Sequence, residues 1–133
     1  MKTETKLIHF SEGIELESGE KLNSFDLMVE TYGELNEGKS NAILLCHAFS
    51  GNHHAAGSSE DFGIGWWDQL VGPSKTIDTN KYFVVCCNNL GGCAGSSGPS
   101  SIDPSSQKIF GKSFPQVSAV SYTHLRAHET KAN

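Results

Sequence analysis

The sequence predicts an α/β fold, in which antiparallel opening strands lead into a mostly parallel sheet. One observation is that residues 24–32 alternate apolar and polar side chains, as in a half-buried antiparallel strand. The other is that residues 42–46 and 82–87 form continuous apolar runs, each followed by a glycine-containing loop. Such runs are typical of parallel strands that are buried on both faces. At 133 residues, the chain is short for an enzyme with a complete α/β sheet.

The opening segment predicts short strands separated by turns. Residues 6–10 and 14–16 have strand-forming side chains, with a turn at Glu12-Gly13 between them and a second turn over residues 17–20. We therefore expect a β-hairpin at the start of the chain, which continues into the strand over residues 24–32 as an antiparallel meander.

The segment between the two apolar runs predicts a crossover connection. Residues 65–71, which include Trp66 and Trp67, have the pattern of a short amphipathic helix. A helix here would complete a βαβ unit and place the loops after both strands at the functional edge of a parallel sheet. Residues 96–113 are rich in Ser, Gly and Pro, and predict a long ordered loop or a lid.

The charge pattern excludes two classes of partner. The formal net charge is −5, the pI is near 5.6, and the basic residues are scattered, so we expect no nucleic-acid partner. No apolar run approaches the roughly 20 residues that span a bilayer, and the first residues do not resemble a signal peptide. We expect a cytoplasmic protein that does not engage membranes.

The cysteines favour reduced, buried thiols over a disulfide framework, because they lie in or beside apolar runs. A zinc site is the alternative, built from Cys86, Cys87, Cys93 and the His53-His54 pair. Adjacent cysteines point to opposite faces of a strand, however, and C-x-x-C spacing is missing. We therefore predict no metal site. Cys46, like the other three cysteines, is predicted to be a reduced, buried thiol.

An ordered series of motifs resembles one known family. The chain resembles the homoserine O-acyltransferases of methionine biosynthesis, and homoserine O-acetyltransferase among them, in the α/β-hydrolase superfamily. The resemblance runs from about residue 6 to residue 118. It is carried by His47-Ala48-Phe49-Ser50-Gly51, Gly65-Trp66-Trp67-Asp68, Asn89-Leu90-Gly91-Gly92-Cys93 and Gly98-Pro99-Ser100-Ser101, with shorter matches at Thr31-Tyr32-Gly33-Glu34-Leu35, Gly72-Pro73, Ile77-Asp78-Thr79 and Phe114-Pro115.

The resemblance implies an acyl-transfer enzyme of the α/β-hydrolase fold. A serine on a sharp strand-to-helix turn would attack an acyl thioester and pass the acyl group to the hydroxyl of L-homoserine. Acetyl-CoA, or succinyl-CoA, would be the co-substrate, with no bound cofactor. The parent enzyme would be a homodimer.

The resemblance also implies where the oxyanion is stabilised. A tetrahedral intermediate needs preorganised N–H donors, one of them from the loop after an early parallel strand. By this resemblance, the backbone N–H of Phe49 is the candidate donor, and His47, Ala48, Ser50 and Gly51 support the loop. The alternative is that these residues only turn the chain. His47 is not expected to be the general base, because in this fold the catalytic histidine follows the nucleophile.

A second set of residues is expected to line the cleft: Trp66, Trp67, Asn89, Gly91 and Gly92. For the two tryptophans, packing in the core is an equal alternative. For the loop over residues 89–98, the alternatives are a backbone nest for an anion, such as part of a CoA-like donor, and tight packing of the backbone. Neither a dinucleotide nor a nucleoside triphosphate motif is present.

No G-x-S-x-G-like elbow occurs, so the nucleophile and its Asp and His partners are expected to lie beyond this chain. We expect residues 1–118 to be a partial α/β-hydrolase domain, truncated before the nucleophile elbow and inactive alone. Residues 119–133 resemble a translated transposase-type sequencing adapter and are expected to be non-native. The alternative is a genuine basic tail, in which His124 and His128 have the helical spacing of a zinc pair.

Alternative functions stay open at this point. They are homoserine O-succinyltransferase, L-serine O-acyltransferase, an esterase of the same fold, and a small binding domain without catalysis.

Overall fold

The structure is a computed structural model that describes residues 1–118 and Ser121. By contacts the chain divides into two compact units. Unit 1 contains residues 1–6 and 29–87, and unit 2 contains residues 7–28 and 88–133. The expected non-native tail, with His124 and His128, lies outside the described residues apart from Ser121, so its boundary after Ser118 stays a prediction.

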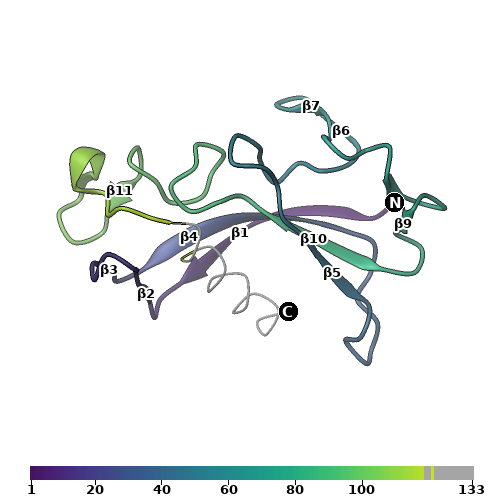
Figure 1. Cartoon of the computed structure of the whole chain (residues 1–133), viewed down its shortest axis with the longest axis horizontal. Helices are drawn as coiled ribbons and strands as arrows, with labels where there is room; N and C mark the ends of the chain where they lie inside the picture. The colour runs from purple at the N-terminus through teal and green to yellow at the C-terminus, as the bar shows by residue number, and fades with distance from the viewer. Residues whose placement is uncertain (119–120, 122–133) are drawn as a thin grey trace. The chain divides into compact units, whose positions relative to one another are not determined.

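The principal sheet has four strands in the order β1-β4-β10-β5 (Figure 1). They are β1 (Thr3–Phe10), β4 (Phe25–Tyr32), β10 (Phe83–Cys87) and β5 (Ala42–Leu45). Strand β10 runs antiparallel to β4 and parallel to β5, with Val84 opposite Ile43. Antiparallel opening strands that lead into a parallel pair are the predicted arrangement, and the predicted fold class is confirmed.

Short ladders and one turn of 3₁₀ helix complete the described fold. The ladders pair β2 (Ile14–Glu15) with β3 (Lys21–Leu22), β6 (Ser58–Ser59) with β7 (Gly63–Ile64), β8 (Val71–Gly72) with β9 (Ile77–Asp78), and β11 (Ile102–Asp103) with β12 (Lys108–Ile109); the 3₁₀ helix η1 is Gly111–Ser113. The last ladder and η1 lie in the segment predicted as an ordered loop.

The predicted opening hairpin is wrong in its pairing. Strand β2 pairs with β3 and not with β1, whose neighbour in the principal sheet is β4. The turn over residues 17–20 closes tightly, since Leu16 N–H donates to Glu20 O at 2.8 Å and Gly19 N–H to Leu16 O at 2.9 Å. The closed turn brings β2 against β3 and leaves β1 free to pair with the longer strand.

The predicted helix over residues 65–71 is also wrong. That segment forms a single turn, in which Val71 N–H donates to Trp67 O at 3.0 Å. The turn cannot lengthen because Val71 already belongs to β8, which pairs in parallel with β9. The crossover from β5 to β10, which is described throughout, therefore contains turns and short ladders in place of an α-helix.

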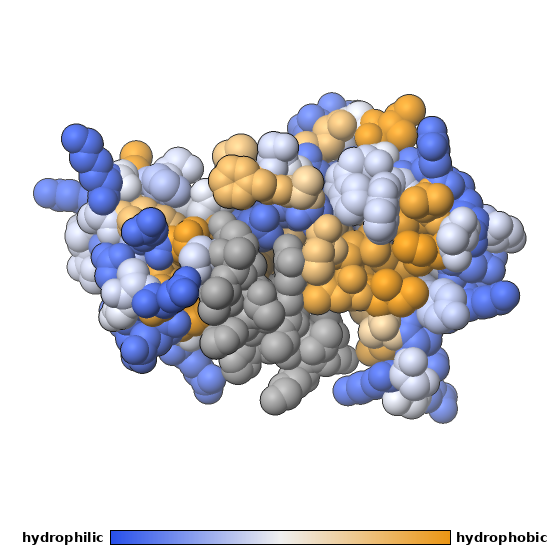
Figure 2. All heavy atoms as spheres, in the orientation of Figure 1, coloured by the Kyte–Doolittle hydropathy of each residue, from blue (hydrophilic) through white to orange (hydrophobic). Residues whose placement is uncertain are grey.

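Burial distinguishes the two parallel strands. Strand β10 is buried from Val84 to Cys87, as predicted, whereas in β5 only Leu45 is buried and Ala42 is exposed. Strand β5 ends the sheet order among the described strands, which explains its exposure. Apolar atoms gather over this region in the space-filling view (Figure 2). Cys86 and Cys87 are buried as predicted, but Cys46 and Cys93 are exposed, so the prediction is wrong for them.

The core of unit 1 is a cluster of buried side chains between β4, β5, β10 and the crossover. Its members are Tyr32, Leu45, Ala55, Ala56, Val71, Val84 and Cys86. No helix in the described part of the chain is both long and apolar enough to cross a bilayer.

Candidate active site

The candidate oxyanion loop is a tight turn directly after β5. Gly51 N–H donates to Ala48 O at 2.8 Å, which makes Phe49 and Ser50 the two central residues of the turn. The Phe49 side chain is 93% exposed. Within the described residues the Phe49 N–H has no hydrogen-bond acceptor. The loop therefore presents an unused backbone donor at the carboxyl end of a parallel strand.

His47 lies beneath this turn. Its ring is buried, and Nδ1 lies 2.7 Å from the carbonyl oxygen of Ala48. Because a carbonyl oxygen only accepts, Nδ1 carries the hydrogen in this contact. A Cβ atom on Gly51 would lie 3.1 Å from that same Nδ1, so a glycine allows the ring to pack close to the turn. This geometry favours the predicted supporting role for His47.

The segment that follows the turn is held by polar contacts to its backbone. Asn52 Oδ1 accepts the N–H of His54 at 2.8 Å. Asn52 O accepts the indole N–H of Trp66 at 3.0 Å and faces the Cys86 thiol at 3.9 Å. The chain after the turn is therefore tied both to β10 and to the turn at residues 65–71.

Tyr32, at the end of β4, reaches the same segment. Its side chain is completely buried, and its hydroxyl accepts the N–H groups of Ala55 at 2.7 Å and Ala56 at 3.1 Å. The hydroxyl also lies 3.4 Å from His53 O, to which it donates. Burial is the main cause that raises the pKa of this phenol well above its ordinary value, so it keeps its proton.

Glu30, two residues earlier on β4, pairs with His54. Nδ1 of His54 lies 3.0 and 3.1 Å from the two carboxylate oxygens, and its Nε2 lies 3.1 Å from Gly63 O. The Gly63 carbonyl requires a hydrogen on Nε2, so a second proton lies between Nδ1 and Glu30. Both side chains are buried. Alternation over residues 24–32 predicts a half-buried strand with Glu30 on its polar side, whereas the structure buries Glu30.

His53 is buried with Nδ1 lacking a partner among the described residues. Burial, together with the neighbouring His54 and His47, lowers its pKa. Its ring makes an edge contact with Phe62, with centroids 5.2 Å apart. A neutral, apolar-packed ring agrees with the predicted role of a loop or wall residue. Within the described residues no cluster of His, Cys, Asp and Glu could hold a metal ion.

The two tryptophans are half-exposed, Trp66 at 38% and Trp67 at 41%, so neither is a core residue. Their rings lie 5.1 Å apart. Their motif is anchored at both ends, since Gly57 N–H donates to Asp68 Oδ1 at 2.8 Å and Gly65 packs on the backbone of Ala55 and Ala56. That N–H, followed by Lys75, lowers the pKa of Asp68. Trp66 is thus joined to the oxyanion loop through Asn52, while lining of a cleft stays a prediction.

In the second predicted loop, residues 89–98 of unit 2, three glycine N–H groups already have acceptors. Gly91 N–H donates to Ser97 O at 2.7 Å, Gly92 N–H to Asn89 O at 3.0 Å, and Gly98 N–H to Ser101 Oγ at 2.9 Å. These three N–H groups are therefore occupied, and the choice between an anion nest and tight backbone packing stays a prediction. That Asn89, Gly91 and Gly92 line the same cleft as the first loop stays a prediction.

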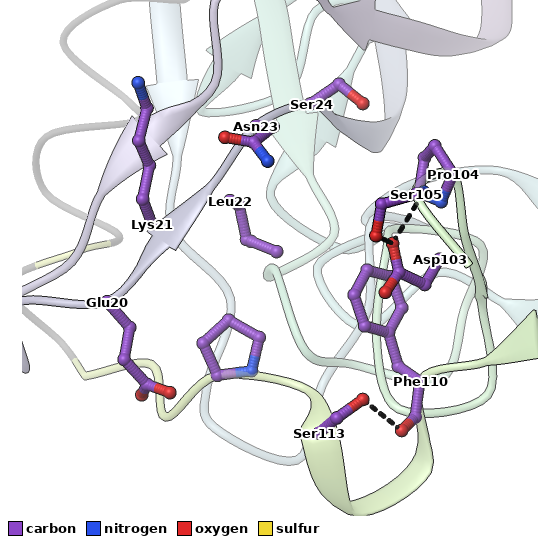
Figure 3. Close-up of a pocket in the computed structure, with 11 residues that line it drawn as sticks. Glu20, Lys21, Leu22, Asn23, Ser24, Asp103, Pro104, Ser105, Phe110 and Ser113 are labelled. Carbon is purple, nitrogen blue, oxygen red and sulfur yellow. Dashed lines mark hydrogen bonds between the residues drawn. The ribbon is translucent and has the colours of Figure 1, made fainter.

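A hollow of about 220 Å³ in unit 2 is separate from these residues. It lies between residues 20–24 and a wall that includes Asp103, Ser105 and Phe110 (Figure 3). The Asp103 carboxylate already accepts the N–H and hydroxyl of Ser105, at 2.9 and 2.7 Å. The hollow is smaller than ordinary ligand pockets, and no predicted site residue lines it.

Sequence reasoning missed Glu30, Tyr32 and Asn52 as residues that hold the candidate loop. The available signal was an acidic residue within an apolar strand, two residues before Tyr32. The alternation of side chains along one strand could not reveal that the Glu30 carboxylate contacts His54, which lies 24 residues later in the chain.

Comparisons with known proteins agree with the predicted resemblance. No protein-family model matches the chain. It is 56% identical over 122 residues to homoserine O-succinyltransferase of Pseudomonas paraeruginosa (strain DSM 24068 / PA7), an alignment that covers 90% of this chain and 32% of that protein. The chain thus spans about a third of the length of the curated relatives that it matches.

Solved structures give the same picture. Esterase E22 matches 98% of this chain and 38% of its own, with a TM-score of 0.86 and 30% identity. Homoserine O-acetyltransferase from Bacillus anthracis matches 98% of this chain and 36% of its own, with a TM-score of 0.82 and 35% identity. Over the residues that it has, the chain is therefore similar to the homoserine O-acyltransferases and has the α/β-hydrolase fold.

Proposed function

We propose that residues 1–118 carry the oxyanion-binding part of a homoserine O-acyltransferase of methionine biosynthesis. The observation that carries the proposal is the turn after β5, with the Phe49 N–H unused at its tip. An amide donor held in place before the reaction stabilises the negative oxygen of a tetrahedral intermediate without having to reorganise. The similarity to homoserine O-succinyltransferases over 90% of this chain supports this assignment.

In the proposed reaction a serine hydroxyl attacks the thioester carbonyl of an acyl-CoA, the C–S bond breaks and the CoA thiol leaves. The hydroxyl of L-homoserine then attacks the acyl-serine, which gives the O-acyl product and restores the serine hydroxyl. The Phe49 N–H binds the oxyanion in both steps, and His47, Ala48, Ser50 and Gly51 keep it oriented. The serine, with its Asp and His partners, is proposed to lie in the part of the relatives' length that this chain does not span. No bound cofactor takes part.

The acyl donor is the finer part of the proposal. The motifs led us to expect acetyl-CoA, with succinyl-CoA as the alternative. The curated relatives at 55–56% identity carry the name succinyltransferase, whereas the 35% identical solved neighbour is an acetyltransferase. We therefore propose succinyl-CoA as the first donor to test, and acetyl-CoA as the second.

A second candidate function is ester hydrolysis, in which water replaces homoserine as the acceptor. The similarity to esterase E22, with its TM-score of 0.86, favours keeping this candidate. The oxyanion requirement is the same for both reactions, so the turn after β5 does not discriminate between them.

A chimeric enzyme tests the proposal. Residues 1–118 replace the matching segment of the P. paraeruginosa protein, and transfer from succinyl-CoA and acetyl-CoA to L-homoserine is measured beside hydrolysis of a simple ester. Phe49→Pro removes the N–H, at a turn position that proline favours. We expect kcat to fall about 100- to 1,000-fold, as for loss of an oxyanion donor. Phe49→Ala keeps the N–H and should retain activity.

Three outcomes count against parts of the proposal. An equal loss of kcat in Phe49→Pro and Phe49→Ala would show that the backbone N–H of Phe49 does not take part in the reaction. Ester hydrolysis without transfer to homoserine would select the esterase. A folded chimera that does neither reaction would contradict the enzymatic assignment of this segment.

A further inference from the structure

Polar side chains of β4 reach across the core of unit 1 to the segment directly after the candidate oxyanion loop. Tyr32 and Glu30 both lie on this strand, and their contacts fall within residues 53–56 and on Gly63 through His54. Tyr32 belongs to the hydrophobic core cluster, and Glu30 and His54 are buried as well. An apolar side chain could fill the same space, so the polar atoms need a separate explanation.

The Tyr32 hydroxyl makes every hydrogen bond that it can. It has one hydrogen and two acceptor positions, which are used by His53 O, Ala55 N–H and Ala56 N–H respectively. These three contacts, to residues 53, 55 and 56, all hold one short stretch of backbone. Gly65 packs against the opposite side of the same stretch, where a Cβ would lie 2.3 Å from the Ala56 nitrogen. The backbone after the loop therefore has little freedom to shift.

The Glu30–His54 pair fixes the same segment one residue earlier. His54 spans from the β4 carboxylate to the carbonyl of Gly63, and its own N–H is held by Asn52 Oδ1. Asn52 directly follows Gly51, the last residue of the turn. A movement of the turn that carries Asn52 with it therefore acts on the contacts that β4 makes through His54.

We infer that Tyr32 and Glu30 are positioning residues, which hold the Phe49 N–H in its oxyanion-binding place through the segment over residues 52–56. This inference rests on the proposed function, since it gives a catalytic purpose to the buried polar contacts. Neither residue touches the reacting atoms. Their contacts with the segment are made through residues 53–56.

Hydrogen exchange on the full 133-residue chain gives the first test. Tyr32→Phe leaves the amides of Ala55 and Ala56 without their acceptor. We expect exchange over residues 47–57 to accelerate by about tenfold or more, the factor that corresponds to losing one such buried hydrogen bond. Exchange over β10 should change far less. Tyr82→Phe is the matched control, because Tyr82 is 41% exposed and its exchange pattern should remain that of the unsubstituted chain.

Glu30 gives a second pair of variants. Glu30→Ala strands the buried Nδ1 of His54, while Glu30→Gln can still donate an amide hydrogen to a neutral His54. We expect faster exchange over residues 47–57 in Glu30→Ala and recovery in Glu30→Gln. Uniform acceleration over β10 and residues 47–57 in both Tyr32→Phe and Glu30→Ala would mean a merely structural role and would overturn the inference.

The chimera described above supplies the catalytic readout. At a temperature well below unfolding, we expect Tyr32→Phe to lower kcat by about tenfold with the KM for acyl-CoA unchanged, because the lost hydrogen bonds displace only the oxyanion donor. An unchanged kcat in a folded, active Tyr32→Phe chimera would overturn the positioning role. A chimera that is inactive before substitution contradicts the proposed function instead, and the exchange experiment then decides by itself whether β4 positions the loop.

Discussion

Two loops follow adjacent parallel strands in this chain, and they differ in whether their backbone N–H groups have hydrogen-bond acceptors. The turn after β5 leaves the Phe49 N–H without an acceptor in the described residues, and the segment directly after the turn is bonded to side chains of β4. The loop after β10 engages the N–H groups of Gly91, Gly92 and Gly98 with oxygen atoms of residues 89–101, and its Ser96 and Ser97 bond to the backbone of β4. The first loop therefore leaves a donor at its tip, whereas these glycine donors of the second loop are occupied.

The largest expected effect comes from the contact that supports the first loop at Gly65. A Cβ there would lie 2.3 Å from Ala56 N and 2.4 Å from Ala55 C, so the backbone must move. We expect Gly65→Ala to lower the free energy of unfolding by about 3 kcal/mol or more, measured by urea denaturation. Gly38→Ala is the control, because its nearest neighbour would be 3.7 Å away. Similar losses in both variants would show that close packing at Gly65 is unimportant.

The next effect concerns the side chain that closes the second loop. Ser96 is buried, donates to Asn88 O at 2.7 Å and accepts the Met28 N–H at 2.9 Å. We expect Ser96→Ala to lower the free energy of unfolding by about 1–3 kcal/mol, because it leaves Asn88 O and the Met28 N–H without their partner. The control is Ser100→Ala at an exposed position, which should lower the free energy of unfolding by less than about 0.5 kcal/mol. Thermal unfolding of both variants measures the difference, and equal midpoints would contradict it.

A glycine in each loop gives a smaller contrast. Gly91 has φ +83°, a conformation that costs an L residue about 1–2 kcal/mol. Gly51 is not in that region, although a Cβ would lie within 3.1 Å of Ala48 O. We expect Gly91→Ala to destabilise the chain more than Gly51→Ala, and Gly51→Ala to lower kcat more in the chimera. The reverse order in either measurement would contradict the proposed difference between the two loops.

The smallest expected effect is the pH dependence from Asp78, which lies in β9 of the crossover. The Ser74 N–H, then the Asn80 N–H, lower its pKa below the ordinary value of 3.8. A lowered folded-state pKa stabilises the protein above that ordinary value, and the contribution is lost as the pH falls through the folded-state pKa. We expect Asp78→Asn to flatten the fall in stability from pH 5 downward. An unchanged pH profile would exclude Asp78 as a contributor.

Much of the fold could be predicted from the sequence because its signals are local. Alternation over residues 24–32 and the two apolar runs predicted β4, β5 and β10, and the motifs predicted the family. The helix predicted over residues 65–71 does not form. An amphipathic pattern of seven residues is also compatible with a turn, and here Val71 pairs with Ile77 in a short parallel ladder. The burial predicted for β5 failed because β5 ends the described sheet order.

The amino-acid sequence by itself determined the longer strands β4, β5 and β10, where the glycine-containing loops fall, and, through the family resemblance, that Phe49 is the candidate donor in one of them. Only the tertiary structure decided that β1 lies beside β4, that Glu30 is buried against His54, and that the Tyr32 hydroxyl holds the backbone after the turn. The reason is physical. Strand and turn preferences act between neighbours in the chain, whereas the support of the loop depends on atoms that only folding brings within hydrogen-bond distance.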